Sequence, residues 1–152
     1  MAQIQIGDEC GDFSLKCQKD TLVDTTSLAG KKLLLSFHPL AWTPVCSAQM
    51  QSLETNFDVL QSLNTVPLGF SVDSVPCKKA WAKSLGIEKV DLLADFWPHG
   101  GWAAKLGIFI DKFGFSERAN IILDEQRKVI FVKVYPLRDL PDIDEVIDFL
   151  KK

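Results

Sequence analysis

The strongest constraint on the fold is an almost unbroken apolar run over residues 32–38, KLLLSFH. A strand that is apolar on both sides of its pleat is buried on both faces, as in the middle of an α/β sheet. Residues 44–63 follow with helical periodicity, and their apolar stripe contains Cys46, Met50, Leu53, Phe57 and Leu60. A buried strand that leads into an amphipathic helix predicts a sheet covered by helices.

The rest of the chain continues this alternation. Residues 66–72 predict a second buried strand, and a helix capped by Asp73 or Ser74 extends to Leu85 and ends at Gly86. The other expected elements are a hairpin of residues 13–16 and 22–24, a strand over 90–93, a helix over 101–106, strands over 118–123 and 128–134, and a helix over 142–152. Parallel strands followed by an antiparallel pair predict a mixed central sheet with helices on both faces. A thioredoxin-like α/β fold with an N-terminal β-hairpin satisfies this order, and residues 1–152 fit one domain.

Composition and charge exclude several classes of protein. The net charge of −3, with basic residues scattered along the chain, argues against nucleic-acid binding. We interpret the pairs Lys31-Lys32 and Lys78-Lys79 as solvated surface. Residues 1–7 do not resemble a signal peptide, and no apolar run approaches the roughly 20 residues of a spanning helix. We therefore expect a cytoplasmic protein with no membrane or nucleic-acid partner.

Four cysteines, at positions 10, 17, 46 and 77, invite a metal or disulfide interpretation. None forms a Cys-x-x-Cys pair, so neither a zinc ribbon nor a thioredoxin-type redox pair is predicted. Neither histidine is spaced from a cysteine or from the other histidine as zinc ligands would be, and no glycine-rich phosphate loop is present. We expect no metal and no cofactor.

Cys46 occupies the most informative stretch of the chain. Pro44 suits the first position of a helix, which places Cys46 in the first helical turn. Free backbone N–H groups and the positive end of the helix dipole favour a thiolate there, so its pKa is expected to be lowered. Thr43 lies at the cap, and Pro39 and Pro44 flank the loop. From this position alone, an inert buried cysteine would fit equally well.

Pro39, Thr43 and Cys46 stand in a Pro-x-x-x-Thr-x-x-Cys pattern that resembles the active-site motif of peroxiredoxins, the AhpC/TSA family. The similarity extends over essentially the whole chain. Residues 95–100 (DFWPHG) and 140–143 (LPDI) look most like the one-cysteine, AhpE-type subgroup. Arg118 matches the family's active-site arginine; without the motif it would be interpreted as a surface residue paired with Glu117 or Asp124.

The resemblance implies a thiol-dependent peroxidase that reduces hydrogen peroxide, organic hydroperoxides or peroxynitrite. Cys46 would attack a peroxide oxygen and become a sulfenic acid. Arg118 would supply a fixed charge and several donors, and Thr43 would orient the peroxide. The backbone N–H groups of Val45 and Cys46 would complete a polar collar.

The same resemblance implies the surroundings of this site. Trp42, Val45 and Trp81 are expected to line the substrate pocket. A homodimer is expected to form through the face that carries the Cys46 loop. A low-molecular-weight thiol, or a thioredoxin- or glutaredoxin-like protein, would reduce the sulfenic acid. An alternative is a redox sensor or chaperone-like binding module, switched by oxidation of Cys46 without turnover.

Some positions depart from the family pattern. Gln49 stands where a glutamate usually holds the arginine, and His38 stands where an aromatic residue is common. Residues 136–152 contain no cysteine, so resolution by a partner subunit's tail is not expected. Cys77, in the first turn of the following helix, is either the resolving cysteine or a bystander thiol. Cys10 and Cys17 are expected to be packing or surface thiols, with a Cys10–Cys17 pair as a minor alternative.

Overall fold

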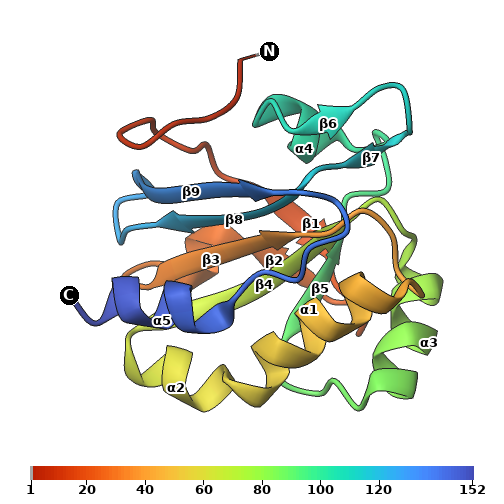
Figure 1. The fold of residues 1–152 in the computed structure, drawn as a ribbon, viewed down its shortest axis with the longest axis horizontal. Coiled ribbons are helices and arrows are strands. Elements are labelled where there is room, and N and C mark those ends of the chain that lie inside the picture. The colour runs from red at the N-terminus through yellow and green to blue at the C-terminus, as the bar shows by residue number, and fades with distance from the viewer. Residues whose placement is uncertain (1) are drawn as a thin grey trace.

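The computed structural model describes residues 2–152, and its centre is a five-stranded mixed sheet (Figure 1). In spatial order the strands are β5 (Asp91–Ala94), β4 (Thr65–Ser71), β3 (Lys32–Phe37), β8 (Arg118–Leu123) and β9 (Val129–Tyr135). The first three strands are parallel, whereas β8 is antiparallel to β3 and β9 is antiparallel to β8. The predicted mixed sheet and thioredoxin-like α/β fold are confirmed.

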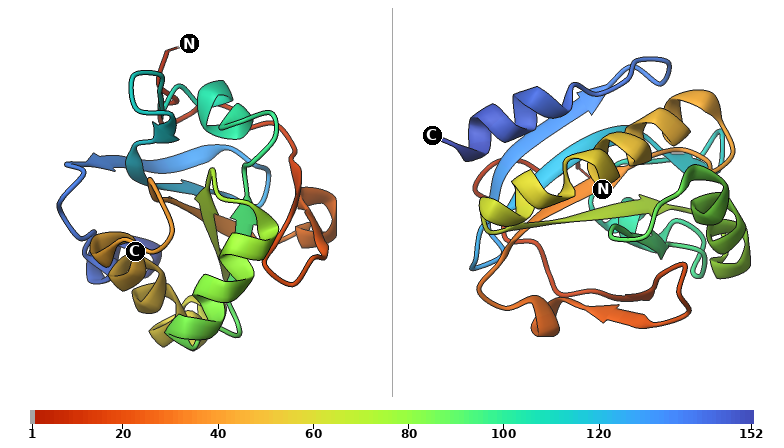
Figure 2. Two further views of the ribbon diagram at one scale, coloured as in Figure 1. Left: turned by 90° about the vertical axis from the view of Figure 1, so that its right-hand side faces the viewer. Right: turned by 90° about the horizontal axis from the view of Figure 1, so that it is seen from below.

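Two layers cover the sheet (Figure 2). On one face lie α1 (Pro44–Thr55), α2 (Phe57–Ser62), α3 (Val75–Leu85) and α5 (Ile143–Leu150), whose apolar side chains form one core cluster. On the other face lie the hairpin of β1 (Ser14–Lys16) and β2 (Leu22–Asp24), the short helix α4 (Gly101–Lys105) and the N-terminal segment. No helix within residues 2–152 combines the length and apolar character needed to cross a bilayer.

The central position of β3 brings the loop that follows it close to the start of β8. Phe37 pairs with Phe70 of parallel β4 on one side and with Ala119 of antiparallel β8 on the other. The end of β3 therefore lies beside the beginning of β8. This register brings the segment that follows Phe37 next to Arg118, the first residue of β8.

Three local features differ from the sequence-based expectation. The helix predicted over residues 44–63 is divided at Asn56, whose side-chain amide donates to the carbonyl of Ser52 at 2.8 Å. Asparagine competes in this way for helical acceptors. The chain also forms a 3₁₀ helix, η1 (Thr25–Leu28), and a pair of two-residue strands, β6 (Phe109–Ile110) and β7 (Phe115–Ser116). Such short elements have no periodicity to detect.

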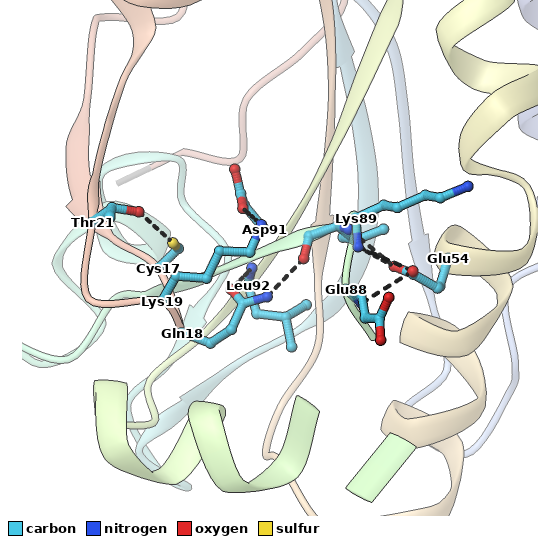
Figure 3. Close-up of polar contacts among 10 residues, drawn as sticks. Cys17, Gln18, Lys19, Thr21, Glu54, Glu88, Lys89, Asp91 and Leu92 are labelled. Carbon is cyan, nitrogen blue, oxygen red and sulfur yellow. Dashed lines mark hydrogen bonds and ion pairs between the residues drawn. The ribbon is translucent and has the colours of Figure 1, made fainter. Parts of the chain in front are cut away.

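The free edge of the sheet at β5 is covered by side chains (Figure 3). Gln18 donates from Nε2 to the carbonyl of Val90 at 2.8 Å and accepts from the N–H of Leu92 at 2.7 Å, as a neighbouring strand would. Glu54 of α1 accepts from the three consecutive N–H groups of Glu88, Lys89 and Val90. These contacts occupy backbone groups that would otherwise be open to pairing with another chain.

Candidate active site

Cys46 lies in the first turn of α1, directly after the loop that follows β3. Thr43 is the N-cap residue with extended backbone, and Pro44 is the first helical residue, where its missing N–H costs nothing. Only 1% of Cys46 is exposed. Its Sγ accepts a hydrogen bond from Nη1 of Arg118 at 3.3 Å, so a charged donor contacts the thiol directly.

Arg118 is 3% exposed and is held in place by all three of its guanidinium nitrogens. Nε and Nη2 both donate to the carbonyl of Leu137, at 3.0 and 2.7 Å. Nη1 donates to Oε1 of Gln49 at 2.8 Å and to Cys46. The planar fork of arginine permits these contacts simultaneously. The charge is therefore fixed toward Cys46, and no ion pair joins Arg118 to Glu117 or Asp124 among the described residues.

Gln49 connects Arg118 to the end of β3. The side chain is buried, and while its Oε1 accepts from Arg118, its Nε2 donates to Oγ of Ser36 at 2.7 Å and to the carbonyl of Phe37 at 3.1 Å. The neutral amide is fully hydrogen-bonded but does not neutralise the guanidinium. The positive charge of Arg118 remains available to an anion at Cys46.

A cleft of about 260 Å³ opens beside the thiol. Its lining comprises Pro39, Leu40, Thr43, Pro44, Val45, Cys46, Phe115, Arg118 and Leu137. The structure thus brings together Pro39, Thr43, Val45, Cys46 and Arg118, five of the residues selected from the sequence. Most of the wall is apolar, which weakens competition from water for charged and polar groups inside. A small polar molecule could reach Cys46 and the N–H groups of the first helical turn, which lack intrahelical acceptors.

Three lining residues were not found from the sequence. Leu40 lies in the loop after β3, Phe115 in the two-residue strand β7, and Leu137 just after β9. They share no motif or spacing. Phe115 precedes β8 and Leu137 follows β9, at the end of the pair where Arg118 lies opposite Tyr135, and this position alone connects them to the site.

The two tryptophans expected in the pocket do not line the cleft. Trp81 is fully buried between the helices and donates from Nε1 to Oγ of Ser47 at 3.1 Å. Trp42 is 55% exposed, with φ of 71°, outside the cleft lining. The hydroxyl of Thr43 donates to the carbonyl of Leu40 at 2.7 Å and so stabilises the loop, rather than contacting the thiol.

Cys77 and Cys10 lie in environments that disfavour thiolates. Burial, followed by the charge of Asp73, raises the pKa of Cys77, whose Sγ donates to Oδ1 of Asp73 at 3.8 Å. The position of Cys77 in a first helical turn would by itself favour a thiolate, but burial and the Asp73 charge outweigh it. Burial raises the pKa of Cys10 to about 11, and Cys17 is fully buried in hydrogen-bond contact with Thr21. All four thiols are free.

Two further polar side chains are buried near the reactive helix. Lys78 and His38 are both inaccessible to solvent, and neither the Lys78 ammonium nor either His38 ring nitrogen has a hydrogen-bond partner in the part of the chain that the structure describes. Lys79 is exposed, so the expectation that Lys78-Lys79 is solvated surface holds for Lys79 and is wrong for Lys78. Among residues 2–152, no three His, Cys, Asp or Glu side chains are grouped as metal ligands would be.

The comparisons with known proteins agree with this geometry. The model of the AhpC/TSA family matches residues 6–132. Alkyl hydroperoxide reductase E of Mycobacterium tuberculosis is 30% identical over 86% of this chain and 86% of that protein. Thiol peroxidase of Streptococcus sanguinis is 33% identical over 98% of this chain and 90% of that protein.

Solved structures give the same result. Enterococcus faecalis AhpC superimposes with a TM-score of 0.89 at 25% identity, over 99% of this chain and 92% of that one. Reduced 2-Cys peroxiredoxin of Plasmodium vivax gives a TM-score of 0.85 at 27% identity, over 96% and 80% of the two chains. The chain therefore belongs to the AhpC/TSA family, the peroxiredoxins.

Proposed function

We propose that Cys46 is the residue through which this chain, a thiol-dependent peroxidase, reduces hydroperoxides. The observation that carries the proposal is the 3.3 Å contact between Arg118 Nη1 and Cys46 Sγ at the floor of the apolar cleft. The guanidinium and the helix N-terminus both favour a reactive thiolate at this position.

The reaction follows from these groups. The Cys46 thiolate attacks one peroxide oxygen, the O–O bond breaks, and the sulfur is oxidised to a sulfenic acid. The departing oxygen carries the electron pair of the broken bond and leaves as water from hydrogen peroxide or as an alcohol from an organic hydroperoxide, in each case after taking up a proton, and as nitrite from peroxynitrite. Arg118 and the N–H groups of Val45 and Cys46 are the donors that stabilise the developing charge. Hydrogen peroxide, organic hydroperoxides and peroxynitrite are the proposed substrates.

An external thiol is the proposed reductant of the sulfenic acid. Cys77 is a weaker candidate, because its pKa is raised and its Sγ is hydrogen-bonded to a carboxylate. A resolving thiol reacts as its thiolate, so this environment slows attack. We propose a low-molecular-weight thiol, or a thioredoxin- or glutaredoxin-like protein, in that role.

Peptide mapping tests both steps. Anaerobically reduced protein is treated with one equivalent of hydrogen peroxide, trapped with a sulfenic-acid reagent and digested, with Cys46→Ser and Cys77→Ser variants in parallel. The proposal expects a sulfenic acid on Cys46 in the wild type and in Cys77→Ser, and turnover when an external thiol is added. An unmodified Cys46 would refute it. A Cys46–Cys77 disulfide would show that Cys77, rather than an external thiol, reacts with the sulfenic acid. Oxidation of Cys46 without turnover would instead support a redox sensor.

The proposal includes a homodimer in a reducing compartment, the cytoplasm. Leu40 and Leu137, which line the cleft, and Trp42, which lies in the same loop as Leu40, expose apolar surface, and this supports association through this face. The four free thiols and the need for a thiol reductant support a reducing compartment. Sedimentation that shows only monomers at micromolar concentration would refute the dimer.

A further inference from the structure

Lys78 is a buried cation with no direct partner among the described residues. Its side chain is fully inaccessible to solvent, and within residues 2–152 its ammonium makes no hydrogen bond and no ion pair within 4 Å. Burial of a charge without a direct hydrogen-bond or ion-pair partner is costly, so such a residue is rare unless its charge has a use.

Trp81 connects Lys78 with the helix that carries Cys46. The Lys78 Nζ lies 6.0 Å from the centroid of the Trp81 ring, at the limit of a cation–π contact. The indole Nε1 of the same ring donates to Ser47, the residue after Cys46. Cys46 and Trp81 belong to one cluster of buried, mostly apolar side chains. In such surroundings charges interact over longer distances than at the surface.

The two carboxylates whose charges act on Lys78 are hydrogen-bonded to other donors rather than to its ammonium. Asp73 accepts from the N–H of Ala41 at 2.8 Å and from the hydroxyl of Ser71 at 2.6 Å. Asp95 accepts from the N–H groups of Trp102 and Ala103.

The charges around Lys78 come from several elements of the fold. Burial lowers the pKa of Lys78 to about 8, whereas Asp73, Cys77, Cys46 and Asp95, in that order, act to raise it. Coupling between two titrating groups is reciprocal. A Cys46 thiolate that stabilises the charged form of Lys78 is therefore stabilised by the Lys78 ammonium by the same free energy.

The remaining neighbour, His38, does not supply a competing charge. Its ring lies 5.3 Å from that of Trp81, and burial, followed by the charge of Lys78, holds the pKa of His38 well below 6.5. Arg118 of β8 also acts on His38 in this direction. The charges of Lys78 and Arg118 therefore both act on a neutral imidazole, and the neutral amide of Gln49 gives Arg118 no negative partner.

We propose that Lys78 is a positioning residue for the Cys46 reaction, a buried ammonium against Trp81 that favours the thiolate from the core while Arg118 binds it from the cleft. The inference rests on the proposed role of Cys46. Lys78 itself touches neither the thiol nor the substrate cleft. It contributes charge across a region of low dielectric constant.

The variant Lys78→Met tests this directly, with Lys79→Met as the matched control, because Lys79 is exposed on the same helix. The measurement is the pH dependence of Cys46 alkylation by iodoacetamide, resolved by peptide mapping. The thiolate titration midpoint should rise by about one pH unit in Lys78→Met, the lower end of the effect of an opposite charge. Lys79→Met should leave it unchanged. An unchanged midpoint in Lys78→Met would overturn the proposal.

A reciprocal measurement keeps the test valid if Lys78→Met does not fold. In protein with isotope-labelled lysine, the titration of Lys78 is followed by NMR in the wild type and in Cys46→Ser. Removal of the thiolate should lower the titration midpoint of Lys78, and equal midpoints would refute the coupling. The proposed function is tested separately: if peroxide fails to protect wild-type Cys46 from alkylation, Cys46 is not the peroxidatic residue, whatever Lys78 does.

Discussion

Replacing Arg118 by lysine separates the geometry of the guanidinium from its charge. Arg118 reaches the Leu137 carbonyl, Gln49 and Cys46 through three different nitrogens. A lysine keeps the charge but has one nitrogen, which cannot occupy the positions of Nε and Nη1 together. Loss of the charged hydrogen bond to Cys46 removes about 1.5–3 kcal/mol, equivalent to a roughly 10- to 150-fold slower second-order reaction with hydrogen peroxide.

Stopped-flow fluorescence of the reduced protein measures this rate, and Arg127→Lys provides the control. Arg127 also donates to several carbonyls, those of Lys31, Thr25 and Leu28, but does not line the cleft. Its variant should lose stability and keep the wild-type peroxide rate. If Arg118→Lys reacts as fast as Arg127→Lys, the contact to Cys46 does not determine reactivity.

Three further outcomes concern the buried neighbours of the site. Ser47→Ala leaves the Trp81 Nε1 donor without its partner and should lower the free energy of unfolding by about 1–3 kcal/mol, measured in urea. Gly69→Ala would place a Cβ 2.5 Å from Met50 Sδ and 2.8 Å from a Leu92 methyl group, so overpacking should cost about 1–3 kcal/mol in the same assay. For His38, the folded pKa lies well below the unfolded value of 6.5, so on acidification only the unfolded chain gains the proton. Stability should therefore fall as the pH drops below 6.5, and His38→Phe should remove that dependence; an unchanged slope in the variant would contradict it.

The fold was predictable from the sequence wherever periodicity and capping agreed. Residues 32–38 predicted β3, and Ser74 and Gly86 marked the ends of α3, where Ser74 accepts from the N–H of Cys77 and Gly86 adopts the left-handed conformation. The break at Asn56 and the strands β6 and β7 were not predicted. Their causes are a single side-chain hydrogen bond and a two-residue pairing, neither of which produces a repeating pattern.

The site was predictable where residues lie close together in the sequence. Pro39, Thr43 and Cys46 fall within one loop and helix start, so their proximity follows from local structure. The burial of Lys78 could not be inferred, because a lysine within a basic pair is normally solvated. The role of Leu137 depends on its backbone carbonyl, which any residue at that position would provide.

The pairing of β3 with β8 has a consequence for how chains of this kind can change in length. Cys46 and Arg118 are 72 positions apart, yet the ladder that joins Phe37 to Ala119 sets their separation. The length of the chain between these two residues does not set the distance between their side chains. Insertions or deletions in its exposed turns, such as residues 111–113 between β6 and β7, should therefore leave the thiol and the guanidinium in register. Descendants of one ancestral chain can diverge in size there while they keep the same chemistry.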